Sequence, residues 1–240
     1  MKVIITKNYD EMSDEAFKIM KNVVITKPDA VLGLATGTSP IGLYQRMVID
    51  CKENGTSYKK IKTVNLDEYV GLDESSDQSY VYFMRNNLFY HIDIDLNNTH
   101  LANGKAKDMR EECVGYNKLV ESMQQDLQVL GIGSNGHIAF NEPGTPLDSL
   151  THIVDLTENT IKDNSRLFKN IEDVPRHAIT MGLKNIMNAK KIIMLATSEH
   201  KAKAVFDMVK GRVSSDCPAS VLQLHPDVTV IIDEAAAKLL

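Results

Sequence analysis

Short apolar segments alternate with amphipathic segments along the whole of this 240-residue chain. In the amphipathic segments, apolar residues recur at positions i, i+3, i+4 and i+7, which predicts helices. The pattern is clearest from Tyr44 to Cys51 and from Ala202 to Val209. The apolar segments are apolar at nearly every position, which is typical of parallel strands buried on both faces. We expect strands at residues 3–6, 31–35, 63–66, 127–132, 192–196 and 228–232.

This alternation predicts an α/β fold with an open, mostly parallel, doubly wound sheet of the Rossmann-like type and helices on both faces. The sequence contains no linker, internal repeat or low-complexity tract, so we expect a single domain over residues 1–240. The longest stretch without a clear strand is 141–188. We expect it to hold helices, loops and a lid region that follows the sequence FNEP at 140–143.

Charge and cysteine content exclude several classes of protein. The 27 basic and 32 acidic residues are interspersed and give a net charge of −5. No basic stripe favours nucleic acid as a partner, and no basic amphipathic helix favours a membrane surface. The three cysteines, Cys51, Cys113 and Cys217, are far apart and lack the spacing of metal ligands. They predict reduced thiols in a cytoplasmic protein without a metal site.

The sequence LGIGSNGHIAFNEP at 130–143 is the strongest indication of an enzyme. Here an apolar strand runs into glycine-rich backbone, which brings Asn135, His137 and Glu142 close together in the sequence. Open α/β sheets bind ligands at the carboxyl ends of their strands. An imidazole there can accept and donate a proton near neutral pH, and a carboxylate can assist it. These three residues are therefore candidate catalytic residues.

The glycines of this segment also match a nucleotide-binding pattern. Gly131, Gly133 and Gly136 fit G-x-G-x-x-G, in which a helix follows the third glycine. We reject dinucleotide binding because Pro143 would cut such a helix short and because the pattern lies in the middle of the chain. A buried structural histidine is the alternative for His137, and the surrounding glycines and Glu142 weaken it.

A second candidate site is the sequence ATGTSP at 35–40, between an expected strand and an expected helix. Pro40 suits the first helical position and Ser39 suits the N-cap, while glycine lets the backbone approach a ligand. The free N–H groups of a helix start favour an anion, most plausibly phosphate. A well-capped turn without a ligand is the alternative. The candidate phosphate-binding residues are Thr36, Gly37, Thr38 and Ser39.

Two further segments place charged residues at expected strand ends. In ATSEHK, at 196–201, Lys201 lies near a helix start and could add a positive charge to a phosphate site, although a solvated surface lysine is the simpler alternative. In NLDEYVG, at 65–71, the adjacent carboxylates Asp67 and Glu68 point to opposite faces of a strand. One of them could face the site while the other makes structural bonds. Desolvation would raise the pKa of such a carboxyl and make it a better base. Turn capping by Asp67 is the alternative.

Three of these segments, together with a fourth near residue 224, resemble a known family. GIGSNGHIAFNEP, NLDEYVGL, ATGTSP and LQLHP at 222–226 are similar to the glucosamine/galactosamine-6-phosphate isomerase family, and within it to the short glucosamine-6-phosphate deaminases. The resemblance covers nearly the whole chain in order and spacing. The related 6-phosphogluconolactonases share the fold and a similar glycine-rich turn, but typically differ after the histidine.

The resemblance implies roles for individual residues. Asp67 would move the proton between carbon 2 and carbon 1 of the opened sugar, His137 would open the ring, and Glu142 would orient the imidazole. Asn135 stands where many members have Asp, so the proton relay here would consist of His137 and Glu142. The implied substrate- and phosphate-binding residues are Thr36, Gly37, Thr38, Ser39, Glu68, Gly136, Arg166 and Lys201.

The implied reaction converts glucosamine 6-phosphate and water into fructose 6-phosphate and ammonia. It uses no cofactor and no metal, and the enzyme is a hydrolase of possible homo-oligomeric state. Longer members carry an effector site with basic residues after FNEP, where 145–154 offers His152 but no Arg or Lys. Two other functions remain open: a 6-phosphogluconolactonase, which needs no carbon-2 base, and a non-catalytic sugar-phosphate sensor.

Overall fold

A computed structural model describes residues 1–156, 161, 168, 170 and 173–240. Within them, the main sheet has the strand order β1–β10–β9–β6–β2–β3–β5, and neighbouring strands run parallel. Its strands are β1 (Lys2–Thr6), β2 (Val31–Leu34), β3 (Lys62–Asn65), β5 (Thr99–His100), β6 (Leu127–Gly131), β9 (Ile192–Ala196) and β10 (Val228–Asp233). All six expected strands are present, with ends shifted by one residue at most.

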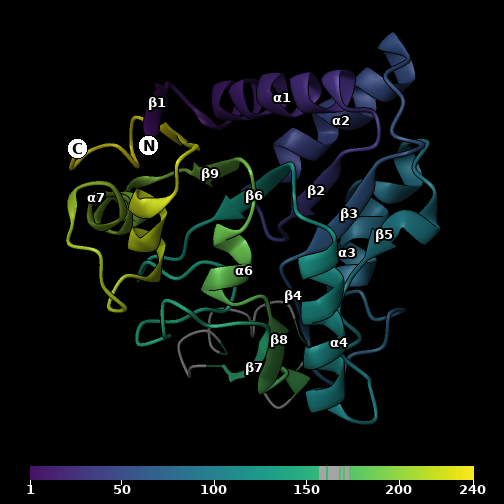
Figure 1. Cartoon of the computed structure of the whole chain (residues 1–240). Helices are drawn as coiled ribbons and strands as arrows, with labels where there is room; N and C mark the ends of the chain where they lie inside the picture. The colour runs from purple at the N-terminus through teal and green to yellow at the C-terminus, as the bar shows by residue number, and fades with distance from the viewer. Residues whose placement is uncertain (157–160, 162–167, 169, 171–172) are drawn as a thin grey trace.

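Helices cover both faces of this sheet, as Figure 1 shows. The first group, α1, α2 and α3, contributes to one hydrophobic cluster, and α4, α6 and α7 contribute to the other. The helices are α1 (Tyr9–Thr26), α2 (Ile41–Asn54), α3 (Tyr80–Asn87), α4 (Met109–Ser122), α6 (Leu183–Met187) and α7 (Ala202–Lys210). None of the helices in the described ranges is long and apolar enough to cross a membrane.

The strands of the main sheet bury side chains on both of its faces. In β9, Ile193 and Leu195 pack with the α1–α2 side, whereas Ile192 and Met194 pack with the α4–α7 side, and all four are fully buried. This alternation explains why the strands are apolar at nearly every position. The predicted doubly wound α/β fold is confirmed.

A second, smaller sheet has the order β4–β8–β7 and is antiparallel. It consists of β4 (Asp67–Tyr69), β7 (His152–Asp155) and β8 (His177–Thr180). The expectation of only helices and loops in 141–188 was therefore wrong, because β7 and β8 lie there. Only one residue, Leu66, separates β3 from β4, so the chain passes directly from the large sheet to the small one.

The order of the strands creates a natural binding position between β2 and β6. From β2 the chain continues to β3 on one side, whereas β6 lies on the other side and leads to β9. At such a switch point the loops after the two strands turn away from each other and leave a crevice at the carboxyl ends. The candidate motifs 35–40 and 130–143 follow β2 and β6, so the topology brings them together.

Candidate active site

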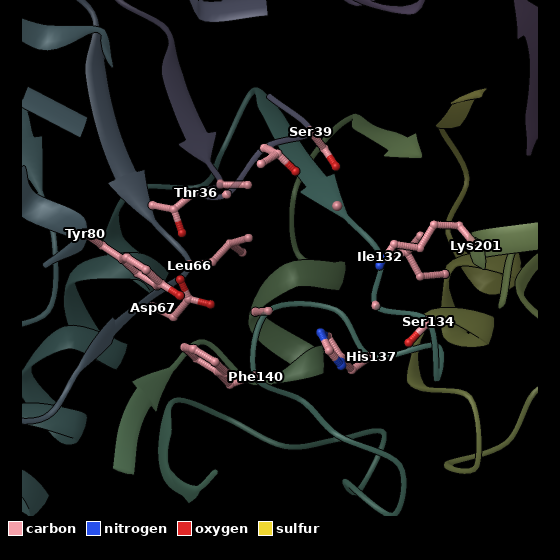
Figure 2. A pocket seen from close by; sticks show the side chains of 16 residues that line it. Thr36, Ser39, Leu66, Asp67, Tyr80, Ile132, Ser134, His137, Phe140 and Lys201 are labelled. Atoms are coloured by element: carbon pink, nitrogen blue, oxygen red, sulfur yellow. The ribbon is translucent and has the colours of Figure 1, made fainter. Parts of the chain in front are cut away.

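A cavity of about 260 Å³ lies at this switch point. Loops after β2 and β6, the start of β4 and the segment before α7 supply its walls. Figure 2 shows Asp67 and Tyr80 on one side of the cavity and Lys201 on the other, with His137 below them. The lining residues are Ala35, Thr36, Gly37, Thr38, Ser39, Leu66, Asp67, Tyr80, Gly131, Ile132, Gly133, Ser134, His137, Ala139, Phe140 and Lys201.

The loop after β2 presents unpaired backbone donors to the cavity. Among the described residues, the N–H groups of Gly37, Thr38 and Ser39 have no protein acceptor. Gly37 adopts a φ of +88°, which turns the backbone there in a way that other residues rarely adopt. Successive N–H groups before a helix form an anion-binding site.

The expected cap of α2 was wrong by one residue. The helix begins at Ile41, its N-cap is Pro40, and no side chain caps it. The Ser39 side chain lines the cavity instead of capping. Tyr9 contributes to this helix start, because its hydroxyl accepts the N–H of Gly42 at 2.7 Å and donates to the carbonyl of Thr38 at 2.9 Å.

Lys201 enters the cavity from a strained loop after β9. Ser198, three residues earlier, has a φ of +76°, which is unfavourable for a residue with a Cβ. Both carboxylate oxygens of Asp233, at the end of β10, accept the N–H of Ser198 at 3.0 Å. Asp233 thus holds the loop in the conformation that delivers Lys201 to the cavity.

Asp67 is the buried carboxyl of the site. It lines the cavity and is 7% exposed. Burial and, to a smaller extent, the neighbouring charge of Glu68 raise the pKa of Asp67 to about 8. The raised pKa agrees with the expectation for a desolvated base. Asp67 does not cap a turn, because it is paired with Thr180 as a residue of the small sheet.

Glu68 does not line this cavity. Its carboxylate accepts the backbone N–H groups of Tyr69, Tyr80 and Val81 at 2.8–3.0 Å. The structure therefore gives the two adjacent carboxylates different surroundings, as alternation along a strand requires. The expected contact between Glu68 and a substrate is not supported by this geometry.

His137 and Glu142 come together at the other wall. The Nδ1 atom of His137 lies 3.4 Å from Oε1 of Glu142, within the distance of an ion pair when the ring is protonated. Among the described residues, this nitrogen has no hydrogen-bond partner. Glu142 is 8% exposed, so solvent screens the electrostatic interaction between its carboxylate and the imidazole only weakly.

Asn135 links the histidine turn to Glu142. Its Nδ2 donates to Oε2 of Glu142 at 2.6 Å, and its Oδ1 accepts the N–H of His137 at 3.1 Å. A carboxylate at position 135 would need a proton to make the first bond. The amide makes it without one, while Oε1 of the same Glu142 carboxylate faces the imidazole. Asn135 itself does not line the cavity.

Two glycines shape the turn that holds His137. A Cβ on Gly133 would lie 2.3 Å from the Cε1 atom of the imidazole, so only glycine leaves room for the ring. Gly136 has a φ of +87°, and a Cβ there would meet the sulfur of Cys217 at 2.6 Å. Gly136 lies behind the cavity wall rather than in it, and its part in the site is to permit the turn.

The sequence did not single out the aromatic wall of the cavity. Tyr80 and Phe140 stack with ring planes 4° apart and centroids 6.2 Å apart. Burial raises the pKa of the Tyr80 hydroxyl well above its usual value, and the neighbouring side chains of Tyr69 and Thr36 also act on it. Tyr80 lies on α3, in a segment without a recognisable motif. Only the tertiary fold brings it next to Asp67 and Tyr69.

The chain has clear relatives among known proteins. A profile of the family described as glucosamine-6-phosphate isomerases/6-phosphogluconolactonase matches residues 7–231. The chain belongs to this family. The glucosamine-6-phosphate deaminase of Clostridium novyi (strain NT) is 50% identical over 238 residues, which are 99% of each chain.

Solved structures of family members agree with the fold. A monomeric glucosamine-6-phosphate deaminase superimposes with a TM-score of 0.97 at 45% identity, over 100% of both chains. The 6-phosphogluconolactonase of Trypanosoma brucei superimposes with a TM-score of 0.80 at 18% identity, over 100% of this chain and 98% of that one. The second match concerns the fold alone.

The remaining expectations concern Arg166, metal ligands and the cysteines. Arg166 lies outside the described residues. Among the residues that are described, no group of three or more His, Cys, Asp or Glu side chains could hold a metal ion. The three cysteines are not joined in disulfides.

Proposed function

We propose that this chain is a glucosamine-6-phosphate deaminase, which converts glucosamine 6-phosphate and water into fructose 6-phosphate and ammonia. One observation carries the proposal. A single cavity joins a buried carboxyl with a raised pKa, a histidine–carboxylate pair and a set of anion donors. Relatives about 50% identical over the full chain carry the same activity in their names.

The phosphate would bind at the side of the cavity remote from Asp67. The N–H groups of Gly37, Thr38 and Ser39 and the ammonium of Lys201 supply donors and positive charge there. Binding at this end holds the sugar in register, so that carbon 2 meets Asp67 on the opposite side. Remote binding energy of this kind can be used to orient the reacting atoms.

Ring opening would be the task of His137. The imidazole takes the proton of the anomeric hydroxyl and gives a proton to the ring oxygen, which breaks the bond between carbon 1 and that oxygen. Glu142, 3.4 Å from Nδ1, stabilises the protonated ring that forms between these two transfers. Asn135 keeps Glu142 in place.

Isomerisation and deamination would follow at Asp67. Its carboxylate removes the proton from carbon 2 while the aldehyde oxygen takes up a proton, which gives an enolamine. The carboxyl then returns its proton to carbon 1 as the nitrogen gives one up, which leaves a hydroxyl on carbon 1 and an imine at carbon 2. Water adds to the imine, the carbon–nitrogen bond breaks, and ammonia leaves behind the ketone of fructose 6-phosphate. A base with a pKa near 8 is much better suited to carbon acids than an ordinary aspartate.

Ammonia release from glucosamine 6-phosphate tests the proposal directly, with hydrolysis of 6-phosphogluconolactone measured in parallel. We expect ammonia and fructose 6-phosphate in equal amounts. Lactone hydrolysis without ammonia would favour the lactonase, whose reaction needs no base at carbon 2. Binding of sugar phosphate without either reaction would favour a sensor.

We expect Lys201→Ala to raise KM by about 10- to 100-fold and to change kcat by less than about threefold, because it removes binding that substrate and transition state share. Steady-state kinetics with glucosamine 6-phosphate measure both constants. Lys203→Ala is the matched control, since Lys203 pairs with Asp207 on the same helix and does not line the cavity. An unchanged KM in the Lys201 variant would remove this residue from the phosphate site.

We also expect no strong activation by N-acetylglucosamine 6-phosphate. The segment 145–154 carries no Arg or Lys, and the ring of its only histidine, His152, is bonded to the carbonyl of Leu150 at 2.8 Å. Rate curves should be hyperbolic with and without this compound. A sigmoidal curve that the compound makes hyperbolic would contradict the prediction.

The remaining parts of the proposal concern assembly and location. The relative of known structure is described as monomeric, and we extend this state to the present chain in place of a homo-oligomer. Light scattering of the purified protein measures it. A cytoplasmic location and a substrate contact by Arg166 stay predictions.

A further inference from the structure

Glu68 is a buried carboxylate beside the proposed base, but it faces away from the cavity. It is 3% exposed. Its Oε1 accepts the N–H groups of Tyr69 at 2.8 Å and Tyr80 at 3.0 Å, and its Oε2 accepts that of Val81 at 3.0 Å. Burial raises the pKa of Glu68, and these three donors oppose the rise by stabilising the charged form.

Two of the three donors are the first N–H groups of α3. The side chain of the N-cap residue Ser79 accepts the N–H of Tyr82, at 3.0 Å. Glu68 takes the N–H groups of Tyr80 and Val81, which the cap leaves without a partner. A carboxylate also suits the positive end of a helix dipole. The start of α3 is therefore fixed by a side chain of β4.

The residue that this arrangement fixes is Tyr80. Its ring lies 4.9 Å from the ring of Tyr69 and stacks on Phe140 at 6.2 Å. Tyr80 lines the cavity together with Thr36, in the loop after β2. Figure 2 shows the Tyr80 ring beside the Asp67 carboxyl on the same side of the cavity.

Glu68 also acts on Asp67 through its charge. The titratable groups around Asp67 are Glu68 on the same strand, the phenols of Tyr80 and Tyr116, and His137 across the cavity. After burial, the Glu68 charge is the cause that raises the pKa of Asp67. Removing the charge lowers this pKa.

We propose that Glu68 is a positioning residue of the deaminase, whose carboxylate holds Tyr80 against the base and so sets the surroundings of proton transfer at Asp67. This inference rests on the proposed function. It gives Glu68 a role in place of the substrate contact that the sequence suggested. Catalysis depends on it through Asp67 and Tyr80, because a small displacement of reacting groups costs a large factor in rate.

Two variants of Glu68 separate its bonds from its charge. Glu68→Gln keeps one oxygen acceptor but loses the charge, and we expect kcat to fall about tenfold. Glu68→Ala loses every acceptor, and we expect a fall of about 100-fold or more. In both variants the acid limb of the pH profile of kcat/KM should move to lower pH, with KM nearly unchanged.

The matched control is Ser79→Ala, which removes the other side-chain acceptor at the same helix start. It should lower the melting temperature, since loss of a cap costs about 1 kcal/mol, and leave kcat and the acid limb as in the parent. The parent enzyme is assayed first: no ammonia from it would refute the proposed function itself.

With an active parent, three results would overturn the role of Glu68. One is a Glu68→Gln variant with the parental kcat and pH profile. Another is an equal loss of kcat in Ser79→Ala, which would indicate general stability of α3. The third is a rise in KM that exceeds the fall in kcat, which would indicate direct contact with substrate.

Discussion

Asp67→Asn is expected to lower kcat for ammonia release by about 10³-fold, as loss of a general base does. The amide fills the same space but cannot take the proton from carbon 2. KM should change by less than about threefold, because the phosphate is held at the other side of the cavity. Steady-state kinetics with glucosamine 6-phosphate measure both constants.

The control for this variant is Asp73→Asn, the same substitution at an exposed carboxylate that pairs with Lys105 outside the cavity. It should keep the parental rate. Activity retained in Asp67→Asn would show that proton transfer at carbon 2 uses another group.

The Asp67→Asn substitution should also stabilise the fold at alkaline pH. The pKa of Asp67 is about 8 in the folded chain and about 3.8 in the unfolded one. Its contribution to stability is therefore fully present below pH 3.8 and is lost as the pH rises through 8. Asparagine does not ionise, so the variant should melt at least about 2–4 °C above the parent at pH 9, for roughly 1 kcal/mol. If the difference in melting temperature between the variant and the parent were the same at pH 5 and at pH 9, Asp67 would not be a buried carboxyl with a raised pKa.

The second large effect is expected for His137→Gln, which should lower kcat on the cyclic substrate by about 10²- to 10³-fold. Glutamine cannot carry a proton between the anomeric hydroxyl and the ring oxygen. An analogue that lacks the carbon-4 and carbon-5 hydroxyls can close neither a furanose nor a pyranose ring, so the variant should process it at a rate much nearer to that of the parent. Comparison of the two substrates isolates the ring-opening step.

His177→Gln offers a control of the same chemistry. His177 forms a histidine–carboxylate pair with Asp155 at 2.7 Å, but this pair is exposed and lies outside the cavity. Its loss should leave both rates unchanged. If His137→Gln handles the open analogue no better than the cyclic sugar, ring opening is not the task of His137.

The sequence predicted six of the seven strands of the large sheet, because its central strands are buried on both faces and therefore carry a signal of their own, whereas β5, with only two half-buried residues, was not predicted. The strands of the small sheet carry little signal. In β7 the side chains alternate between half-buried and exposed over only four residues, from His152 to Asp155. Its identity depends on pairing with β8, which a local pattern does not contain. The error over 141–188 has this cause.

The candidate site divides in the same way. Residues in recognisable turns, such as Ser39 and His137, were found because glycine and cap chemistry act locally. Tyr80 was missed because its place depends on a hydrogen bond to Glu68 and on stacking against Phe140, and both contacts cross between elements. Alternation along the strand predicts that Asp67 and Glu68 point to opposite sides. Only the tertiary fold shows which of the two faces the cavity.

The passage from one sheet to the other at Leu66 separates two properties of the cavity. The anion donors belong to loops of the large sheet, whereas Asp67 belongs to the small one. Substitutions of residues that pack against the small sheet can thus change which substrate carbon lies next to the Asp67 carboxyl without weakening phosphate binding. During divergence the reaction can therefore change while the phosphate-binding site stays the same. This separation between the two sheets permits a family that is described by both isomerases and lactonases.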